Sequence, residues 1–266
     1  MQALSIPELR AIQLSLLDDV HSFCQANGLL YSLCGGTMLG AVRHKGYIPW
    51  DDDIDLMMPR EDYDRFLKTF RHERDFVVDL SARTDCTEQF LKVCREGTVM
   101  VDTRTGKKMW EVNIDIFPVD GMPEDWMSYG DHLRAIHKKI MDICPYYKGM
   151  EGGKRAVWFL KYCIKRLVYF SPHGIGALKR ELNRLAHENL PEQSPYSTVI
   201  FGDFIIYRFP TRLFCEYEDV LFEGKPYRCI VDRHTYLSTV YKDYMQLPPE
   251  EKRVTHHTYD VFLLSE

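Results

Sequence analysis

Residues 35–59 read GGTMLGAVRHKGYIPWDDDIDLMMP and place four aspartates within five positions. Two glycines stand at the start of the stretch, and apolar residues flank the aspartates. Carboxylates so close together repel one another unless a positive charge lies among them. The stretch therefore indicates a site that binds a cation.

The aspartates fall in an extended run that we expect over residues 48–58. Side chains alternate between the two faces of a strand, so Asp51, Asp53 and Asp55 share one face, while Asp52 points toward the core. Asp53 and Asp55 are then about 6–7 Å apart along the strand. Two ionised carboxylates so placed can both reach one hard cation, most commonly Mg²⁺. The pattern leaves the role of Asp51 open.

A further carboxylate lies in the apolar run that we expect to form a strand over residues 110–117 and to end at Pro118. Asp115 stands there between two isoleucines. A carboxylate among β-branched residues costs free energy unless it is paired or bound to a metal. If the two strands are neighbours, Asp115 joins Asp53 and Asp55 in a cluster that one or two metal ions would neutralise.

The two glycines point to a phosphate site. Gly35 and Gly36 precede Thr37, which we expect to cap a short helix over residues 38–43. Glycine lets a backbone approach a ligand closely, and the free N–H groups of a helix N-terminus favour anions. A phosphate held here and bridged to a metal on the aspartates is the working arrangement of phosphoryl transfer. A simple glycine turn beside solvated acids is the alternative, and the ordered combination of motifs favours the metal–phosphate site.

Composition narrows the classes of protein. The chain has 266 residues, of which 45% are apolar, which suits one large domain or two small ones. The net charge of −5, with both signs mixed, disfavours a nucleic-acid partner. The N-terminus lacks a signal-peptide pattern, and no apolar run reaches the length of a membrane span, so we expect a cytoplasmic protein. Eight cysteines without zinc-binding spacing predict buried, reduced thiols.

Hydrophobic periodicity predicts an α+β fold with a mixed sheet and flanking helices. Besides the segments above, we expect helices over 7–27, 61–70 and near 236–246, and strands over 29–33, 76–80, 90–94 and 99–103. The pattern is mainly helical from 123 to about 192. We divide the chain into a catalytic core at 1–122, a helical region at 123–198 and a C-terminal segment at 199–266 that packs back on the core.

The order of these motifs resembles the nucleotidyltransferase superfold that DNA polymerase β also has. Longer strings are similar to the LicD family of phosphocholine transferases: CGGTMLGAVRH at 34–44, GYIPWDDDID at 46–55, IDIFPVDG at 114–121, FEGK at 222–225, and YKDYM followed by LPP at 241–249. The resemblance is dense over 29–70, 110–122 and 220–257. The helical middle carries little of it.

The resemblance implies Mg²⁺-dependent transfer of a phospho-alcohol, with Mn²⁺ as a substitute. The donor would be CDP-choline or another CDP-alcohol, and CMP would be released. The acceptor would be a sugar hydroxyl of a lipid-linked glycan precursor, such as one of teichoic acid or lipopolysaccharide. The family pattern falls on Gly35 and Gly36 as the phosphate turn and on Asp53, Asp55 and Asp115 as metal-binding and catalytic carboxylates. Asp115 would also take the proton of the acceptor hydroxyl.

Other residues have weaker assignments. Thr37, Arg43 and His44 would bind the donor phosphates, although the basic turn at 43–45 fits a solvated surface equally well. A choline headgroup needs aromatic faces or a carboxylate, for which we select Trp50, Trp110 and Tyr244. The chain departs from the family at Lys242, where glycine is usual, and near 229–234, where a proline often precedes the closing helix. Both departures leave the identities of the donor and of the acceptor open.

Two rival functions stay open. One is nucleotidyl transfer to a small hydroxyl substrate, such as adenylylation of an antibiotic, and the other is nucleotide binding without catalysis. Residues 154–170 are basic and apolar without an acid. They fit a core helix with a basic edge or a peripheral contact at the inner membrane face.

Overall fold

The computed structural model describes all residues except 144–163, 165–173, 201–204, 256–257 and 265–266. The α-helices among the described residues are α1 (Ile6–Asn27), α2 (Gly35–Arg43), α3 (Arg60–Thr69), α4 (Trp126–Ile143), α6 (Ile175–Glu188) and α7 (Arg233–Tyr241). The strands are β1 (Gln2–Ala3), β2 (Ser32–Leu33), β3 (Asp55–Pro59), β4 (Asp75–Asp79), β5 (Leu91–Arg95), β6 (Thr98–Asp102), β7 (Asn113–Met122), β8 (Tyr196–Val199), β9 (Phe209–Pro210), β10 (Tyr217–Phe222), β11 (Lys225–Ile230) and β12 (Tyr259–Leu263).

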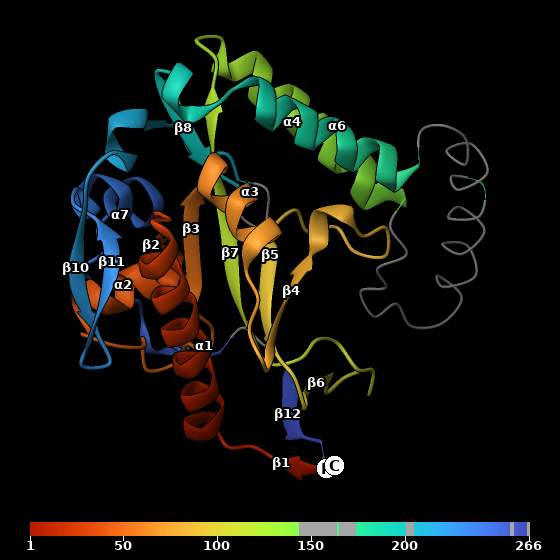
Figure 1. Cartoon of the computed structure of the whole chain (residues 1–266), viewed down its shortest axis with the longest axis vertical. Helices are drawn as coiled ribbons and strands as arrows, with labels where there is room; N and C mark the ends of the chain where they lie inside the picture. The colour runs from red at the N-terminus through yellow and green to blue at the C-terminus, as the bar shows by residue number, and fades with distance from the viewer. Residues whose placement is uncertain (144–163, 165–173, 201–204, 256–257, 265–266) are drawn as a thin grey trace.

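The central sheet has the strand order β2-β3-β7-β5-β4, and β8 with β9 adds to β7 beyond the end of β5. β3 and β7 are parallel, and the other neighbours in this sheet are antiparallel. Separate small sheets are formed by β1, β12 and β6 and by the β10–β11 hairpin. This mixed sheet with helices around it confirms the expected α+β class (Figure 1).

One face of the sheet packs against α1 and α3, which cross it in Figure 1. Ile114 and Ile116 of β7 are almost fully buried there, in one core with Leu16 of α1 and Phe66 of α3. Because side chains alternate along a strand, Asp115 points to the opposite face. The expected helices over 7–27 and 61–70 and the strands over 76–80, 90–94 and 99–103 are confirmed with shifts of one residue at most.

The helix that follows the glycines differs from the expectation. It begins at Gly35 with Cys34 as the N-cap, so Thr37 lies inside α2 and is not its cap. The Thr37 side chain has another partner, because the backbone N–H of Asp55 donates to its Oγ1 at 2.8 Å. The hydroxyl thus ties the first turn of α2 to the first residue of β3.

The extended run expected over 48–58 is mostly not a strand, since β3 begins only at Asp55. The preceding loop contains a turn in which the N–H of Asp51 donates to the carbonyl of Ile48. Two side chains of α1 hold this loop: Arg10 donates to the carbonyl of Ile48 at 3.2 Å, and Gln13 donates to that of Asp52 at 2.8 Å. The strand expected over 29–33 is likewise reduced to β2, at 32–33.

The strand that carries Asp115 does not end at Pro118 as expected but continues to Met122. The N–H of Asp115 faces β3, because it donates to the carbonyl of Ile54. Strand N–H groups alternate in direction, so the nitrogen of Pro118 faces the other side. β5 has already ended there at the pair Leu91–Ile116, and β8 begins beyond it. A missing N–H is therefore tolerated at this position.

The C-terminal part contacts the first third of the chain at several points. The β10–β11 hairpin turns at Glu223 and Gly224, both with positive φ, and the Glu223 carboxylate accepts from the N–H of Tyr47 at 2.9 Å. A side chain at Gly46 would collide with that carboxylate. The FEGK and GYIP strings therefore meet in the fold, where they form a structural contact between two turns.

The closing helix differs from its expected range of 236–246. α7 begins at Arg233, with the Asp232 side chain accepting from the N–H of Thr235, and ends at Tyr241. It ends because Lys242 adopts φ +63° and ψ −114°, a backbone conformation that suits glycine.

The helical region contains α4 and α6, which pack on each other around a small second core (Figure 1). Lys179 of α6 is buried and donates to the carbonyls of Leu80 at 2.7 Å and Glu88 at 2.9 Å, which attaches the helix to the core. Of the basic segment 154–170, only Ile164 belongs to the described residues. The three-part division of the chain stays a prediction.

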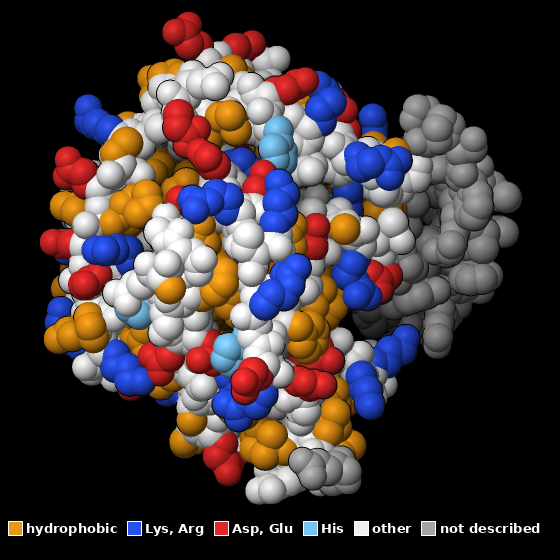
Figure 2. Space-filling view, in the orientation of Figure 1, with side chains coloured by type: hydrophobic (Ala, Val, Ile, Leu, Met, Phe, Trp, Pro, Cys, Tyr) orange, Lys and Arg blue, Asp and Glu red, His pale blue; other side chains and the backbone are white. Residues whose placement is uncertain are grey.

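Two expectations from the composition concern the charges on the surface and the burial of the cysteines. Figure 2 shows acidic and basic side chains interspersed over one face, in keeping with the mixed composition. Five of the described cysteines are buried thiols, as expected, whereas Cys215 is exposed. Within the described part of the chain, no helix is both long and apolar enough to cross a membrane.

Candidate active site

Asp55 and Asp115 occupy the same register position on the parallel strands β3 and β7. On the other side of β7, Lys92 of β5 is the register partner of Asp115. The three side chains therefore form one row across three adjacent strands, on the face opposite α1 and α3. The row requires β3, β7 and β5 to be neighbours in that order.

Asp53 lies in the loop before β3, and Asp51 lies two residues earlier. Burial raises the pKa of Asp55 well above its ordinary value, and the negative charges of Asp53, Asp115 and Asp51 raise it further. Four carboxylates are thus close enough to repel one another. A bound cation would reverse this effect, which is the behaviour expected of a metal site.

Lys92 supplies positive charge within this group of carboxylates. Its Nζ lies 2.6 Å from Oδ1 of Asp115 and 3.0 Å from Oδ1 of Asn113. Burial raises the pKa of Asp115, and the Lys92 ammonium opposes that effect. We did not identify Lys92 from the sequence. The available signal was its place between Leu91 and Val93, since alternation puts it on the face opposite these buried residues.

Gly35 and Gly36 bring the start of α2 against the carboxylates. Gly35 has φ +52°, and a Cβ at this position would lie 2.8 Å from Oδ2 of Asp55. A Cβ on Gly36 would lie 2.6 Å from Oδ2 of Asp51. The N–H of Gly35 donates to the hydroxyl of Tyr236 at 3.3 Å. Glycine is therefore required here for close approach, and the phosphate role of the turn stays a prediction.

Asp51, Asp53 and Asp55 stand in the wall of an open cleft of about 850 Å³, and Asp115 is not among its lining residues. Its lining comes from α2, from the loop before β3, and from the segment after α7: Gly36, Leu39, Arg43, Ile48, Trp50, Asp51, Asp53, Asp55, Tyr241, Asp243, Tyr244, Gln246, Leu247, Pro248, Pro249, Glu251, Lys252 and Val254. The cleft thus joins two of the segments that carry the LicD resemblance. It is large enough for a drug-sized ligand.

The structure places two of the three aromatic candidates for headgroup binding in the cleft. Trp50 and Tyr244 line the cleft. Trp110 is not among the lining residues, and the guanidinium of Arg83 lies 5.1 Å from its ring centroid. Tyr241, which the sequence did not single out, lines the cleft beside the other two.

Arg43 lines the cleft, whereas His44, which is hydrogen-bonded to it, is not among the lining residues. Arg43 donates through Nη1 to the carbonyl of Tyr244 at 2.7 Å, and through Nε to Nε2 of His44 at 2.9 Å. Burial and the charge of Arg43 lower the pKa of His44, which agrees with a neutral imidazole that accepts from the guanidinium. Arg43 therefore holds the segment after α7, and the binding of phosphate by this pair stays a prediction.

The donor set suits a hard divalent cation. Asp53, Asp55 and Asp115 offer only carboxylate oxygens, which are the preferred ligands of Mg²⁺ and also suit Mn²⁺. Among the described residues, the group whose ligand atoms all lie within 4.8 Å of one another is a different one, formed by Asp19, His72 and Asp75. That group already contains a cation, because Arg95 Nη2 lies 3.1 Å from Oδ2 of Asp19.

A family model described as "LicD/FKTN/FKRP, nucleotidyltransferase domain" matches residues 28–148. The lipopolysaccharide cholinephosphotransferase LicD of Haemophilus influenzae is 29% identical over 286 aligned positions, which cover 99% of this chain and 100% of that protein. An uncharacterised protein of Rickettsia typhi is 45% identical over 58 residues, or 21% of this chain and 19% of that protein. One of Rickettsia prowazekii is 47% identical over 47 residues, or 18% of each chain.

Proposed function

Because the chain belongs to the LicD family, we propose that it transfers phosphocholine, or a related phospho-alcohol, from a CDP-linked donor to a sugar hydroxyl of a cell-surface glycan precursor. Membership in this family makes the chain a transferase enzyme. The observation that best supports the proposed chemistry is the register pairing of Asp55 with Asp115 beside a cleft of about 850 Å³. Lipopolysaccharide, the acceptor in the relative's name, is the first acceptor to test.

The carboxylates of Asp53, Asp55 and Asp115 would hold one or two Mg²⁺ ions. The chemistry such ions supply is neutralisation of the donor diphosphate and of the charge that develops on the departing CMP. Asp115 would accept the proton of the sugar hydroxyl while the hydroxyl oxygen bonds to phosphorus and the bond to CMP breaks. Lys92 would hold Asp115 in position for that transfer through its 2.6 Å contact.

The headgroup would bind at the aromatic side of the cleft. Trp50, Tyr241 and Tyr244 line it together with Asp243 and Glu251. A quaternary ammonium is attracted to aromatic faces and to carboxylates, whereas uncharged ribitol or glycerol is not. This lining favours a choline headgroup over a polyol.

A lipid-linked acceptor would place the enzyme at the inner face of a membrane. The basic and apolar segment 154–170 supports this part of the proposal through its composition. Co-sedimentation with anionic vesicles at low salt, lost at high salt, is the expected result. Absence of vesicle binding at low salt would favour a core helix instead.

A thermal-shift panel tests the donor. The protein is heated with CDP-choline, CDP-ribitol, CDP-glycerol, CTP or ATP, each with and without Mg²⁺, because ligands that bind the folded state raise its melting temperature. We expect the largest Mg²⁺-dependent shift with CDP-choline. A shift with ATP or CTP, and none with a CDP-alcohol, would contradict the proposal and favour nucleotidyl transfer.

A further inference from the structure

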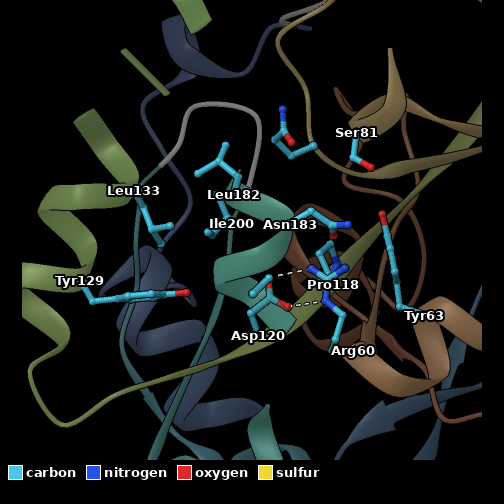
Figure 3. Close-up of a pocket in the computed structure, with 12 residues that line it drawn as sticks. Arg60, Tyr63, Ser81, Pro118, Asp120, Tyr129, Leu133, Leu182, Asn183 and Ile200 are labelled. Carbon is cyan, nitrogen blue, oxygen red and sulfur yellow. Dashed lines mark hydrogen bonds and ion pairs between the residues drawn. The ribbon is translucent and has the colours of Figure 1, made fainter. Parts of the chain in front are cut away.

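Arg60 and Asp120 form a buried ion pair at the far ends of the two strands that carry Asp55 and Asp115. Arg60 donates through Nε to Oδ1 of Asp120 at 2.6 Å and through Nη2 to Oδ2 at 2.8 Å. Both side chains are less than a tenth exposed. Figure 3 shows the paired contacts, with Pro118 beside them.

The pair continues the register of the strands. The β3–β7 ladder matches Asp55 with Asp115 at its start and Pro59 with Val119 at its end. One step further in the same register are Arg60, the first residue of α3, and Asp120. The pair lies five positions along the chain from each aspartate, or roughly 16 Å at the rise of a strand.

The ion pair and the carboxylates project from opposite faces of the sheet. Asp115 and Asp120 differ by an odd number of positions, so alternation directs Asp120 to the face that α3 covers. Arg60 cannot contact substrate in the cleft from that face. Any effect of the pair on the reaction must therefore pass through the strands.

The surroundings hold the guanidinium in one orientation. Its carbon lies 4.9 Å from the ring centroid of Tyr63, and Nη1 lies 3.7 Å from Oδ1 of Asp64. A pocket lies beside the pair, and Figure 3 shows Tyr63 and Asn183 among its walls.

A buried ion pair contributes little net stability, because its desolvation offsets its attraction. The best-attested use of such a pair is to specify one register over its alternatives. The two-pronged contact of arginine with a carboxylate adds a geometric requirement that a single ammonium lacks. A slip of β3 by one residue would separate Arg60 from Asp120 and would turn Asp55 to the wrong face.

We propose that Arg60 and Asp120 are positioning residues that lock the register of β3 against β7 and so set Asp55 opposite Asp115. The consequence of this register lock for catalysis rests on the proposed metal-dependent function. The register itself can be measured without substrate. The lock predicts that cation binding depends on a pair that lies outside the cleft.

The decisive variant is Arg60→Met/Asp120→Leu, which replaces the ion pair with apolar side chains of similar size. Such replacements commonly preserve or raise stability. Asp75→Leu/Arg95→Met is the matched control, because it replaces a buried ion pair in the same way, between register partners on β4 and β5. Hydrogen exchange of backbone amides and the Mg²⁺ dissociation constant are measured in both double variants.

In the Arg60→Met/Asp120→Leu variant we expect faster amide exchange at residues 56–58 of β3 and at Phe117 and Val119 of β7. We also expect a Mg²⁺ dissociation constant raised about 10-fold, the usual effect of losing a residue that orients metal ligands. The control should change neither. Wild-type exchange in those strands with an unchanged Mg²⁺ constant would overturn the inference. Absence of Mg²⁺ binding in the wild type would contradict the proposed function alone, since hydrogen exchange still tests the lock.

Discussion

Lys92 of β5 contacts the carboxylate of Asp115 on the neighbouring strand, with Nζ 2.6 Å from Oδ1. The contact joins a cation to the carboxylate that we propose as proton acceptor. Burial raises the pKa of Asp115, and the ammonium of Lys92 opposes that effect. Lys92 thus has a defined place in the site although no motif of the sequence contains it.

Lys92→Met should reduce turnover about 10- to 100-fold, because Asp115 loses the group that orients it. The melting temperature should also fall, because Asp115 loses its cation, so turnover is compared well below it. Lys225→Met is the control. Lys225, at the exposed start of β11, makes a comparable 2.6 Å contact with Asp18 of α1. Equal turnover in the two variants would contradict the role of Lys92.

Asp55→Asn should abolish turnover and stabilise the protein in the absence of divalent ions. The substitution removes a carboxylate whose ionisation is opposed by burial and by three neighbouring aspartates. We expect a gain of roughly 1 kcal/mol in the free energy of unfolding, the equivalent of less than one unit of pKa. Urea unfolding with a chelator checks the gain, and a loss of stability would show that Asp55 is a structural anchor.

The contribution of Asp55 to the stability of the metal-free protein should fall as pH rises above about 4, the ordinary pKa of an aspartate. The folded state holds the proton of Asp55 more tightly than the unfolded state does, so its contribution is present at low pH and is lost as pH rises through the raised pKa. Mg²⁺ should therefore raise the melting temperature more at pH 8 than at pH 5. The Asp55→Asn variant should lose most of this difference.

Lys242→Gly should stabilise the protein by about 1 kcal/mol, because Lys242 adopts φ +63° and ψ −114°, where strain is of order 1–3 kcal/mol. Lys242→Ala is the control, since it removes the side chain but keeps the strain. Chemical denaturation measures both. Equal stability of the two variants would mean that the backbone at 242 is relaxed.

The positions of Asp55 and Asp115 could be predicted from the sequence because strand alternation depends only on neighbouring residues. The contact of Lys92 could not, since it depends on which strands are adjacent in the sheet. Likewise, Pro118 ends many strands, and only the position of β5 and β8 shows why β7 continues through it.

The conformations of loops could not be predicted from the local sequence pattern either. Asp51 and Asp53 line the cleft from a loop that Arg10 and Gln13 hold from α1, whereas alternation assumed a strand there. The position of Thr37 in the sequence is typical of a helix cap, yet its hydroxyl accepts a hydrogen bond from the backbone N–H of Asp55 on β3. In each case a distant partner decides the outcome.

Product analysis tests the central claim most directly. The protein is incubated with CDP-choline, Mg²⁺ and lipopolysaccharide, and the released nucleotide and the acceptor-bound phosphate are identified, with Asp55→Asn in parallel. We predict equal amounts of CMP and of phosphocholine on the acceptor, and neither product with the variant. Pyrophosphate release from CTP or ATP, without CMP from any CDP-alcohol, would contradict the account.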